Sequence, residues 1–261
     1  MAMDHTRNLE RREFKYLITE ALAEQIKNYL QGICVLDPYA DEAGGYPIRS
    51  LYLDTDEYDL YQANQREDQT RFKARIRSYP QGGQGVWFEI KGRHGDTIQK
   101  SRAGVPEGVW QRLLLEPTSF DRAAFKKKDA PMIERFVYHA QAYHLRPKIL
   151  VEYDRAAYVS TLDDYARVTF DRHIRCQAQN EVSVEAEPSH WRVVDHPRRV
   201  GSRFPLCVLE LKFGAMIPRW MLRLVQHFEV IRYSFSKYCY SVEALHLLPH
   251  SHVAGIQARS F

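Results

Sequence analysis

Short segments in which apolar and polar residues alternate dominate the chain. In residues 72–79, three apolar residues alternate with Lys73, Arg75 and Arg77, and residues 86–91 repeat the pattern after a glycine-rich turn. A period of two is typical of a strand with one apolar face, so these two segments predict a β-hairpin. The same pattern predicts further strands at residues 13–18, 48–54, 148–159, 166–174 and 207–213.

Helical patterns lie between these strands. Apolar residues recur at every fourth position from Leu22 to Leu30, and Thr19 stands where it can cap that helix. Prolines suited to a first helical turn open three more segments, and a last helix follows them; the ranges are 106–115, 131–144, 218–231 and 236–247. No linker divides the chain, so we expect one α+β domain over residues 1–248 and a flexible polar tail at 249–261.

Composition is that of an ordinary soluble globular protein, with 44% hydrophobic and 27% charged residues. The formal charge of +4 is a mild surplus, so we expect no nucleic-acid partner. No run approaches the roughly 18 apolar residues that a membrane span requires, and the charged N-terminus is unlike a signal peptide. We therefore expect a cytoplasmic protein whose four widely spaced cysteines remain reduced thiols.

Charged residues fall on one side of each predicted strand whose other side is apolar. For a single strand, exposure of the charged side to water is the simpler explanation, but Lys and Arg exceed the acids on these sides. A closed barrel offers another arrangement, because apolar faces packed outward against helices leave charged faces lining a tunnel. Unpaired buried cations are costly, and a bound polyanion such as triphosphate would offset that cost.

Short charged motifs follow one another in a fixed order, at residues 12–16, 74–77, 88–91, 99–102, 153–155, 167–171, 208–212 and 235–238. In these motifs the chain resembles the VTC (vacuolar transporter chaperone) polyphosphate polymerase domain, a branch of the triphosphate tunnel metalloenzymes. The resemblance covers nearly the whole chain. It implies an antiparallel β-barrel tunnel of about eight strands, with a charged lumen and surrounding helices.

The resemblance also implies roles for individual residues. It assigns catalytic contacts with the reacting phosphates to Lys15, Arg75, Arg77, Lys91, Arg155 and Arg167. It assigns phosphate binding to Lys100, Lys212, Ser236 and Lys237. It makes Glu210 the ligand of Mn²⁺ or Mg²⁺, with help from Glu89, Glu152 or Asp171.

The implied activity is transfer of the γ-phosphate of ATP onto a polyphosphate chain with release of ADP. The expected partners are therefore ATP and inorganic polyphosphate or triphosphate. Two alternatives stay open: a triphosphatase of the same superfamily, acting on tripolyphosphate or a nucleoside triphosphate, and a non-catalytic polyphosphate-binding module. Arg11 stands where the hydrolytic branches carry a glutamate, which favours the polymerase.

Two further differences from the family affect what we expect of the chain. Ser234 stands where family members often carry a lysine, which predicts slower extension or shorter chains. Eukaryotic relatives carry an N-terminal regulatory domain and a membrane segment. We expect neither in this chain and no direct membrane insertion, so that control and product export depend on a membrane-protein partner.

Overall fold

The computed structural model describes residues 12–247, apart from residues 43, 83–84, 96, 164 and 198–205. The predicted tail at 249–261 and Arg11 lie outside the described residues. The strands are β1 (Arg12–Thr19), β2 (Cys34–Leu36), β3 (Tyr46–Asp54), β4 (Thr70–Ser78), β5 (Val86–His94), β6 (Thr97–Val105), β7 (Arg146–Ser160), β8 (Ala166–Ala178), β9 (Arg192–Val193) and β10 (Leu206–Phe213). The α-helices are α1 (Glu20–Tyr29), α2 (Asp59–Gln65), α3 (Trp110–Leu115), α4 (Ala130–Ala142), α5 (Arg219–His227) and α6 (Lys237–Ala244).

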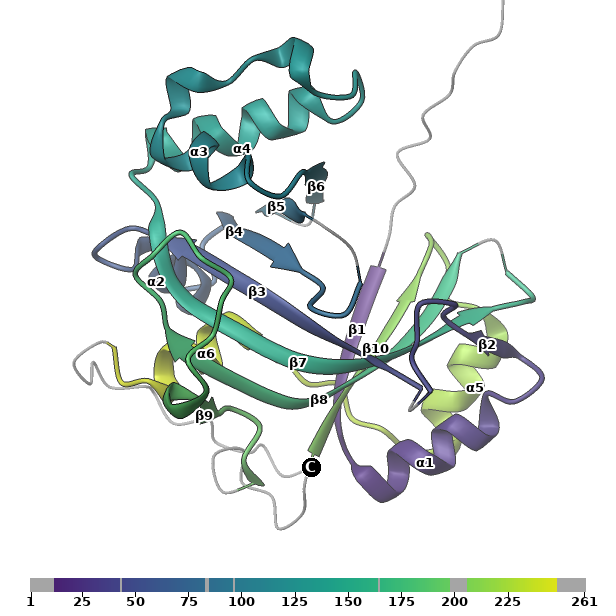
Figure 1. The fold of residues 1–261 in the computed structure, drawn as a ribbon. Helices are drawn as coiled ribbons and strands as arrows, with labels where there is room; N and C mark the ends of the chain where they lie inside the picture. Colours follow the sequence, from purple (N-terminus) through teal and green to yellow (C-terminus); the bar gives the residue numbers. More distant parts are fainter. Residues whose placement is uncertain are drawn as a thin grey trace, which may run out of the picture.

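One antiparallel sheet contains all ten of these strands and confirms the predicted α+β class. Eight of them follow one another in the order β1-β10-β8-β7-β3-β4-β5-β6, while β2 adds to β7 and β9 adds to β8. The sheet curls, so that β4–β6 lie across the molecule from β8 (Figure 1). The main path of the sheet therefore has eight strands, in agreement with the number expected for the barrel.

The expectation of a closed barrel was wrong, because β1 and β6 share no ladder among the described residues. Among the residues that the structure describes, one ion pair reaches across this side of the sheet, between Glu13 of β1 and Lys91 of β5 at 3.7 Å. Cations face one another here, since Lys15 lowers the pKa of Lys91, and Lys212 lowers that of Lys100. Their repulsion disfavours direct pairing of the two end strands.

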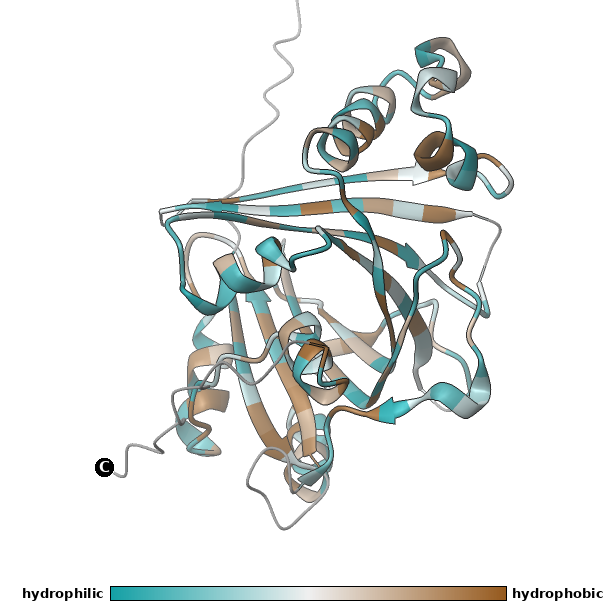
Figure 2. Cartoon of the chain, turned by 90° about the vertical axis from the view of Figure 1, so that its left-hand side faces the viewer, coloured by the Kyte–Doolittle hydropathy of each residue, from teal (hydrophilic) through white to brown (hydrophobic). Residues whose placement is uncertain are grey.

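Helices cover the apolar face of the curled sheet in two groups. Helices α1 and α5 pack on β1, β8 and β10 around Ile26, Phe170 and Leu224. Helices α3 and α4 pack on β3–β6, where Ile76 and Phe136 are buried, and Figure 1 shows them above those strands. Figure 2 shows apolar and polar segments alternating along the strands, as the sequence predicts.

Helix α6 lies on the other face, which we call the inner face. Tyr238 of α6 packs there against Val151 of β7 and Ile174 of β8. A β-bulge makes this possible, because the β7–β8 register shifts between Glu152 and Asp154 of β7. The bulge adds His173, at a left-handed φ of 51°, so Asp171 and Ile174 both point to the inner face.

Helix caps and thiols agree with the sequence analysis. The Thr19 hydroxyl accepts a hydrogen bond from the Leu22 amide at 3.2 Å and caps α1. All four cysteines are free and buried. No helix formed by the described residues is long and apolar enough to cross a membrane.

Helix α2 and strands β2, β6 and β9 were not predicted from the pattern. The start of α2 depends on Asp54, a fully buried carboxylate that accepts hydrogen bonds from the amides of Leu60 and Tyr61, each at 2.9 Å. Tyr238 of α6 also donates its hydroxyl to Asp54. One carboxylate thus joins the end of β3, the start of α2 and α6.

Replacement of Asp54 tests whether its contacts with α2 and α6 stabilise the fold. We expect Asp54→Ala to lower the free energy of unfolding by about 3 kcal/mol, because several buried donors lose their acceptor. The exposed Asp56, which pairs with Lys148, provides the control, and Asp56→Ala should leave the urea midpoint unchanged. Equal midpoints for the two variants would contradict a structural role for Asp54.

Candidate functional site

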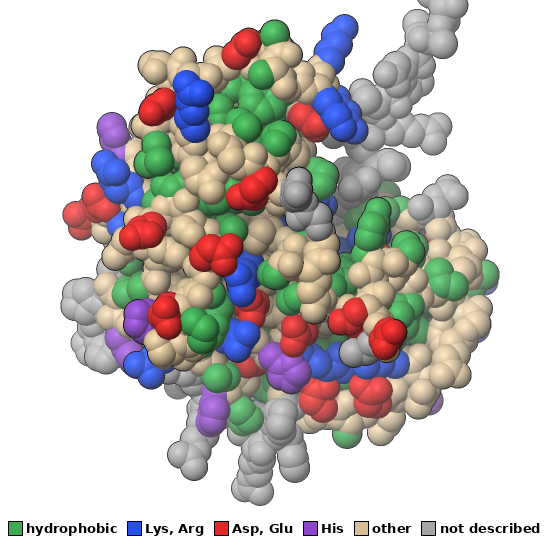
Figure 3. Space-filling view, viewed as in Figure 1, with side chains coloured by type: hydrophobic (Ala, Val, Ile, Leu, Met, Phe, Trp, Pro, Cys, Tyr) green, Lys and Arg blue, Asp and Glu red, His purple; other side chains and the backbone are tan. Residues whose placement is uncertain are grey.

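The inner face gathers the cations that alternate with apolar residues along the strands. Most of the predicted phosphate-binding residues lie on it. Its cations are Lys15, Lys73, Arg75, Arg77, Lys91, Lys100, Arg102, Arg155, Lys212 and Lys237, and its carboxylates are Glu13, Glu89, Asp171 and Glu210. The outside seen in Figure 3 instead mixes acidic and basic side chains. The positive surplus is therefore concentrated on one surface of the sheet.

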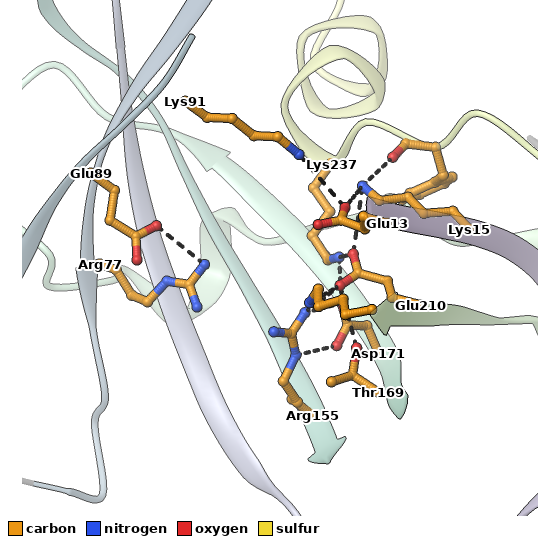
Figure 4. Close-up of polar contacts among 12 residues, drawn as sticks. Glu13, Lys15, Arg77, Glu89, Lys91, Arg155, Thr169, Asp171, Glu210 and Lys237 are labelled. Carbon is orange, nitrogen blue, oxygen red and sulfur yellow. Dashed lines mark hydrogen bonds and ion pairs between the residues drawn. The ribbon is translucent and has the colours of Figure 1, made fainter. Parts of the chain in front are cut away.

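Glu210 of β10 lies at the centre of the first of two ion clusters on this face (Figure 4). The residue is 4% exposed, and both of its carboxylate oxygens face cations. Its contacts are with Lys212 Nζ at 2.6 Å, Arg155 Nη2 at 3.2 Å, Thr169 Oγ1 at 3.3 Å, Lys15 Nζ at 3.5 Å and Lys237 Nζ at 3.6 Å. Strands β1, β7, β8 and β10 and helix α6 thus all contribute to one cluster.

Asp171 of β8 shares two of these cations. Arg155 donates to its two oxygens at 2.6 and 2.7 Å, and Lys237 donates to it as well. Asp171 has no exposed surface, and Lys237 is 7% exposed. Lys237, predicted to bind phosphate, is therefore in contact with two carboxylates.

The carboxylates of this cluster remain ionised at neutral pH. Burial raises the pKa of Glu210, but Lys212, Lys237, Lys15 and Arg155 together hold it well below its usual range. Burial and Glu210 also raise the pKa of Glu13, yet the lysines around it bring it to about 2. The cluster is thus a set of fixed charges.

Glu89 of β5 is the centre of the second cluster. Arg75 lies 2.6 Å from it, Arg102 3.3 Å and Arg77 3.5 Å. Burial raises the pKa of Glu89, but Arg75, Arg77, Lys100 and Arg102 together hold it below its usual range. Figure 4 shows Arg77 and Glu89 on the opposite side from the Glu210 cluster. The paired arginines of residues 74–77 thus share one carboxylate that bridges them.

Two predicted residues lie elsewhere. Arg167 is at the edge of the inner face, 3.8 Å from Asp37, with a side chain that is 43% exposed. Glu152 was proposed as a helper of the metal ligand and this was wrong, because it points to the opposite face and pairs with Arg49 and Arg175. The residues of β7 alternate between faces, so Glu152 and Arg155 cannot meet the same ligand.

The sequence analysis did not assign a role to two cations of the inner face. Lys73 has the same strand phase as Arg75, and this phase was the signal that could have identified it. Arg102 is the register partner of Glu89 across β5 and β6. Ser236, which was predicted, caps α6 by accepting from the Cys239 amide and also accepts from Lys73 at 2.7 Å.

Metal ligands on the inner face are few. The described residues include no group of three or more His, Cys, Asp or Glu side chains that could hold a metal ion. Glu210 with Asp171 beside it offers carboxylate oxygens that are already contacted by cations. Such a donor set fits Mg²⁺ or Mn²⁺ bound through one or two carboxylates and the oxygens of a phosphate ligand.

Comparisons with known proteins agree with the motifs. Residues 10–246 match the family described as VTC domain. The chain belongs to the VTC domain family. This confirms the resemblance on which the residue roles above depend.

Two curated relatives of this VTC domain are both named vacuolar transporter chaperone complex subunit 4. The protein from Trypanosoma cruzi (strain CL Brener) is 27% identical over 77% of this chain and 28% of its own length. The protein from Trypanosoma brucei brucei (strain 927/4 GUTat10.1) is 26% identical over 77% of this chain and 29% of its own length. The chain thus spans less than a third of these relatives.

Two solved structures are similar in outline. A putative adenylate cyclase from Bacillus halodurans has a TM-score of 0.48 and 13% identity, covering 87% of this chain and 94% of that one. The PH1819 protein from Pyrococcus horikoshii OT3 has a TM-score of 0.43 and 10% identity, covering 91% and 98%.

Lys100 gives this VTC domain a testable pH dependence. Lys100 keeps some exposed surface, but desolvation by the surrounding inner face lowers its pKa to about 7, because Arg75 and Arg77 add to the effect and Glu89 only partly opposes it. A bound polyanion favours the protonated lysine, so the affinity for tripolyphosphate should fall as pH rises above 7. Between pH 6 and pH 8, the affinity of wild type relative to Lys100→Arg should fall about tenfold.

The arginine variant stays charged throughout this range, and titration of the ligand itself is common to both proteins. Calorimetric titrations at pH 6, 7 and 8 measure the ratio of the two affinities. A ratio that stays constant would show that Lys100 does not change its protonation state on binding.

Proposed function

We propose that this VTC domain transfers the γ-phosphate of ATP onto a growing polyphosphate chain and releases ADP. The observation that carries the proposal is the excess of cations over carboxylates on one face of the sheet, in a chain that belongs to the VTC domain family. A polyphosphate chain carries many negative charges and acceptor oxygens, which suit arginine forks and lysine ammonium groups. ATP and inorganic polyphosphate are therefore the proposed substrates.

The protonation states of the carboxylates favour phosphate over water as the acceptor. A hydrolase needs an acidic residue that can take a proton from water near neutral pH. The cations of the inner face lower the pKa of Glu13, Glu89, Asp171 and Glu210 despite burial, so none of these groups is a good base. A terminal phosphate of the chain is already an anion and needs no such base.

Positioning and charge stabilisation are the main tasks that remain for the protein. Arg75 and Arg77 would hold the phosphates of ATP, because their forks are fixed by Glu89 and lie on adjacent inward positions of β4. Arg155 and Lys15 would face the opposite side of the same ligand. Charges that are already in position before the reaction require little reorganisation free energy when the transferred group becomes more negative.

Glu210, with Asp171 next to it, would hold the divalent metal. Bound there, Mn²⁺ or Mg²⁺ would supply positive charge to the phosphate oxygens and orient them. Control by other subunits is also proposed, because the relatives are named as subunits of a complex. The tunnel lumen and the cytoplasmic location stay predictions.

A single experiment separates transfer, hydrolysis and binding. Purified protein is incubated with ATP, Mn²⁺ and a short polyphosphate primer, after which the chains are resolved on a gel and ADP and free phosphate are measured. We expect ADP to appear in step with longer polyphosphate and with little free phosphate.

Each alternative gives a distinct outcome in that experiment. Free phosphate equal to ADP with no ladder would identify a triphosphatase. Binding of the primer with ATP left intact would identify a non-catalytic module. Either result would overturn the proposed polymerase.

Glu210→Gln tests the metal-binding carboxylate. We expect ADP release to fall about a hundredfold or more, because without its carboxylate ligand the metal ion no longer supplies positive charge at the reacting phosphates. The affinity for tripolyphosphate should not fall, since every surrounding cation remains. The exposed Glu116, which pairs with Arg112, is the matched control, and Glu116→Gln should keep full activity. Full activity of Glu210→Gln with Mn²⁺ would show that another carboxylate holds the metal.

A further inference from the structure

Three lysines lie side by side across the inner face of β4, β5 and β6. The β4–β5 register pairs Lys73 with Lys91, and the β5–β6 register pairs Lys91 with Lys100. We call these three residues the lysine row. Like charges at directly opposite positions of neighbouring strands destabilise a sheet. Lys91 and Lys100 are exposed to water, whereas Lys73 is only partly exposed, so the need for a compensating interaction is greatest at Lys73.

The carboxylates of the inner face supply only part of that compensation. Lys73 and Lys100 have no ion pair with any described residue, and Lys91 has only Glu13 at 3.7 Å. By contrast, Lys15, Lys212 and Lys237 each contact Glu210. The inner face thus contains one set of cations with close carboxylate partners and a second set, the lysine row, in which the one ion pair among the described residues is that of Lys91 with Glu13 at 3.7 Å.

Lys73 is the member of the row whose surroundings are best defined. Its ammonium group donates to the Ser236 hydroxyl at 2.7 Å and lies 4.0 Å from the Cys239 sulfur, and neither of these partners is a carboxylate. Burial lowers the pKa of Lys73, and the groups that oppose this most are Cys239 and Tyr52 rather than a carboxylate. A desolvated ammonium without a counterion is costly, and an anionic ligand would relieve that cost.

The start of α6 adds to the positive character at the end of the row. Ser236 is the N-cap of this helix, so the first backbone amides of α6 lie beside Lys73. The side chain of the next residue, Lys237, is turned to Asp171 and Glu210. Lys73 is therefore the cation at this helix end that contacts no carboxylate of the described chain.

From this arrangement we infer that Lys73 contacts a phosphoryl group of polyphosphate, and that it extends to the start of α6 the phosphate contacts that the family resemblance already implies for Lys91, Lys100 and Ser236. The inference rests on the proposed function and names the part of the inner face along which the chain lies. The row crosses two inter-strand spacings, or about 10 Å, which suits an extended polyanion better than a single phosphate ion. The arginines around Glu89 remain for the nucleotide phosphates.

Binding of a defined polyphosphate to variants of Lys73 tests the inference. Calorimetric titrations at several salt concentrations compare wild type with Lys73→Gln, Lys73→Arg and the exposed-lysine control Lys127→Gln. We expect Lys73→Gln to weaken binding about tenfold and to reduce the slope of log affinity against log salt by about one. Lys73→Arg should keep both the affinity and the slope, and Lys127→Gln should match wild type.

The outcomes distinguish this inference from the proposed function. Wild-type protein that binds no polyphosphate would remove the proposed function itself. Wild-type binding with an unchanged affinity and salt slope in Lys73→Gln would overturn only the role of Lys73. Equal weakening in Lys73→Gln and Lys73→Arg, with the salt slope of wild type, would show a packing role and also overturn the inference. The thermal midpoint of each variant shows that the compared proteins are folded.

Discussion

The shared ion pairs of Asp171 and Glu210 are the interaction on which the rest of this structure depends. Arg155 and Lys237 each contact both carboxylates, and all four residues are almost fully buried. A buried charge is tolerated only while its partners are present. Removal of any one of these four residues therefore leaves a buried charge of the network without one of its partners. The network thereby fixes β7, β8, β10 and α6 relative to one another.

This dependence explains why one surface can be both structural and functional. Cations that contact carboxylates join strands and helix and keep groups such as Arg75 and Arg77 in a fixed orientation, while cations that lack carboxylates have only a ligand to neutralise them. Lys237 belongs to the first set and Lys73 to the second, although both lie at the start of α6. The helices that pack on the apolar face of the sheet support this division. Because successive side chains of a strand point to opposite faces, apolar residues packed under the helices place the charged residues on the inner face.

Much of this arrangement could be predicted from the sequence, since an alternating period of two fixes both the strand and the side on which each charge lies. The phase of residues 72–79 placed Arg75 and Arg77 on one face correctly. Contacts between distant segments could not be predicted in this way. Nothing local in the sequence shows that Lys237 pairs with Asp171, that Glu152 lies on the other face, or that Lys73 meets Ser236. The open side of the sheet likewise depends on facing cations from β1, β5 and β6.

Because of the bulge at His173, the number of residues in β8 decides which of its side chains point to the inner face. Before it, Thr169 and Asp171 point to the inner face, and after it Ile174 does so, which shifts the inward positions from odd to even numbers. The first half of the strand can therefore serve the ion network while the second half packs under α6. Loss of one residue would restore regular alternation and send one of these two halves to the wrong side. A substitution at a neighbouring position cannot replace the extra residue that reverses the alternation. The number of residues in β8 is therefore constrained more strictly than their types.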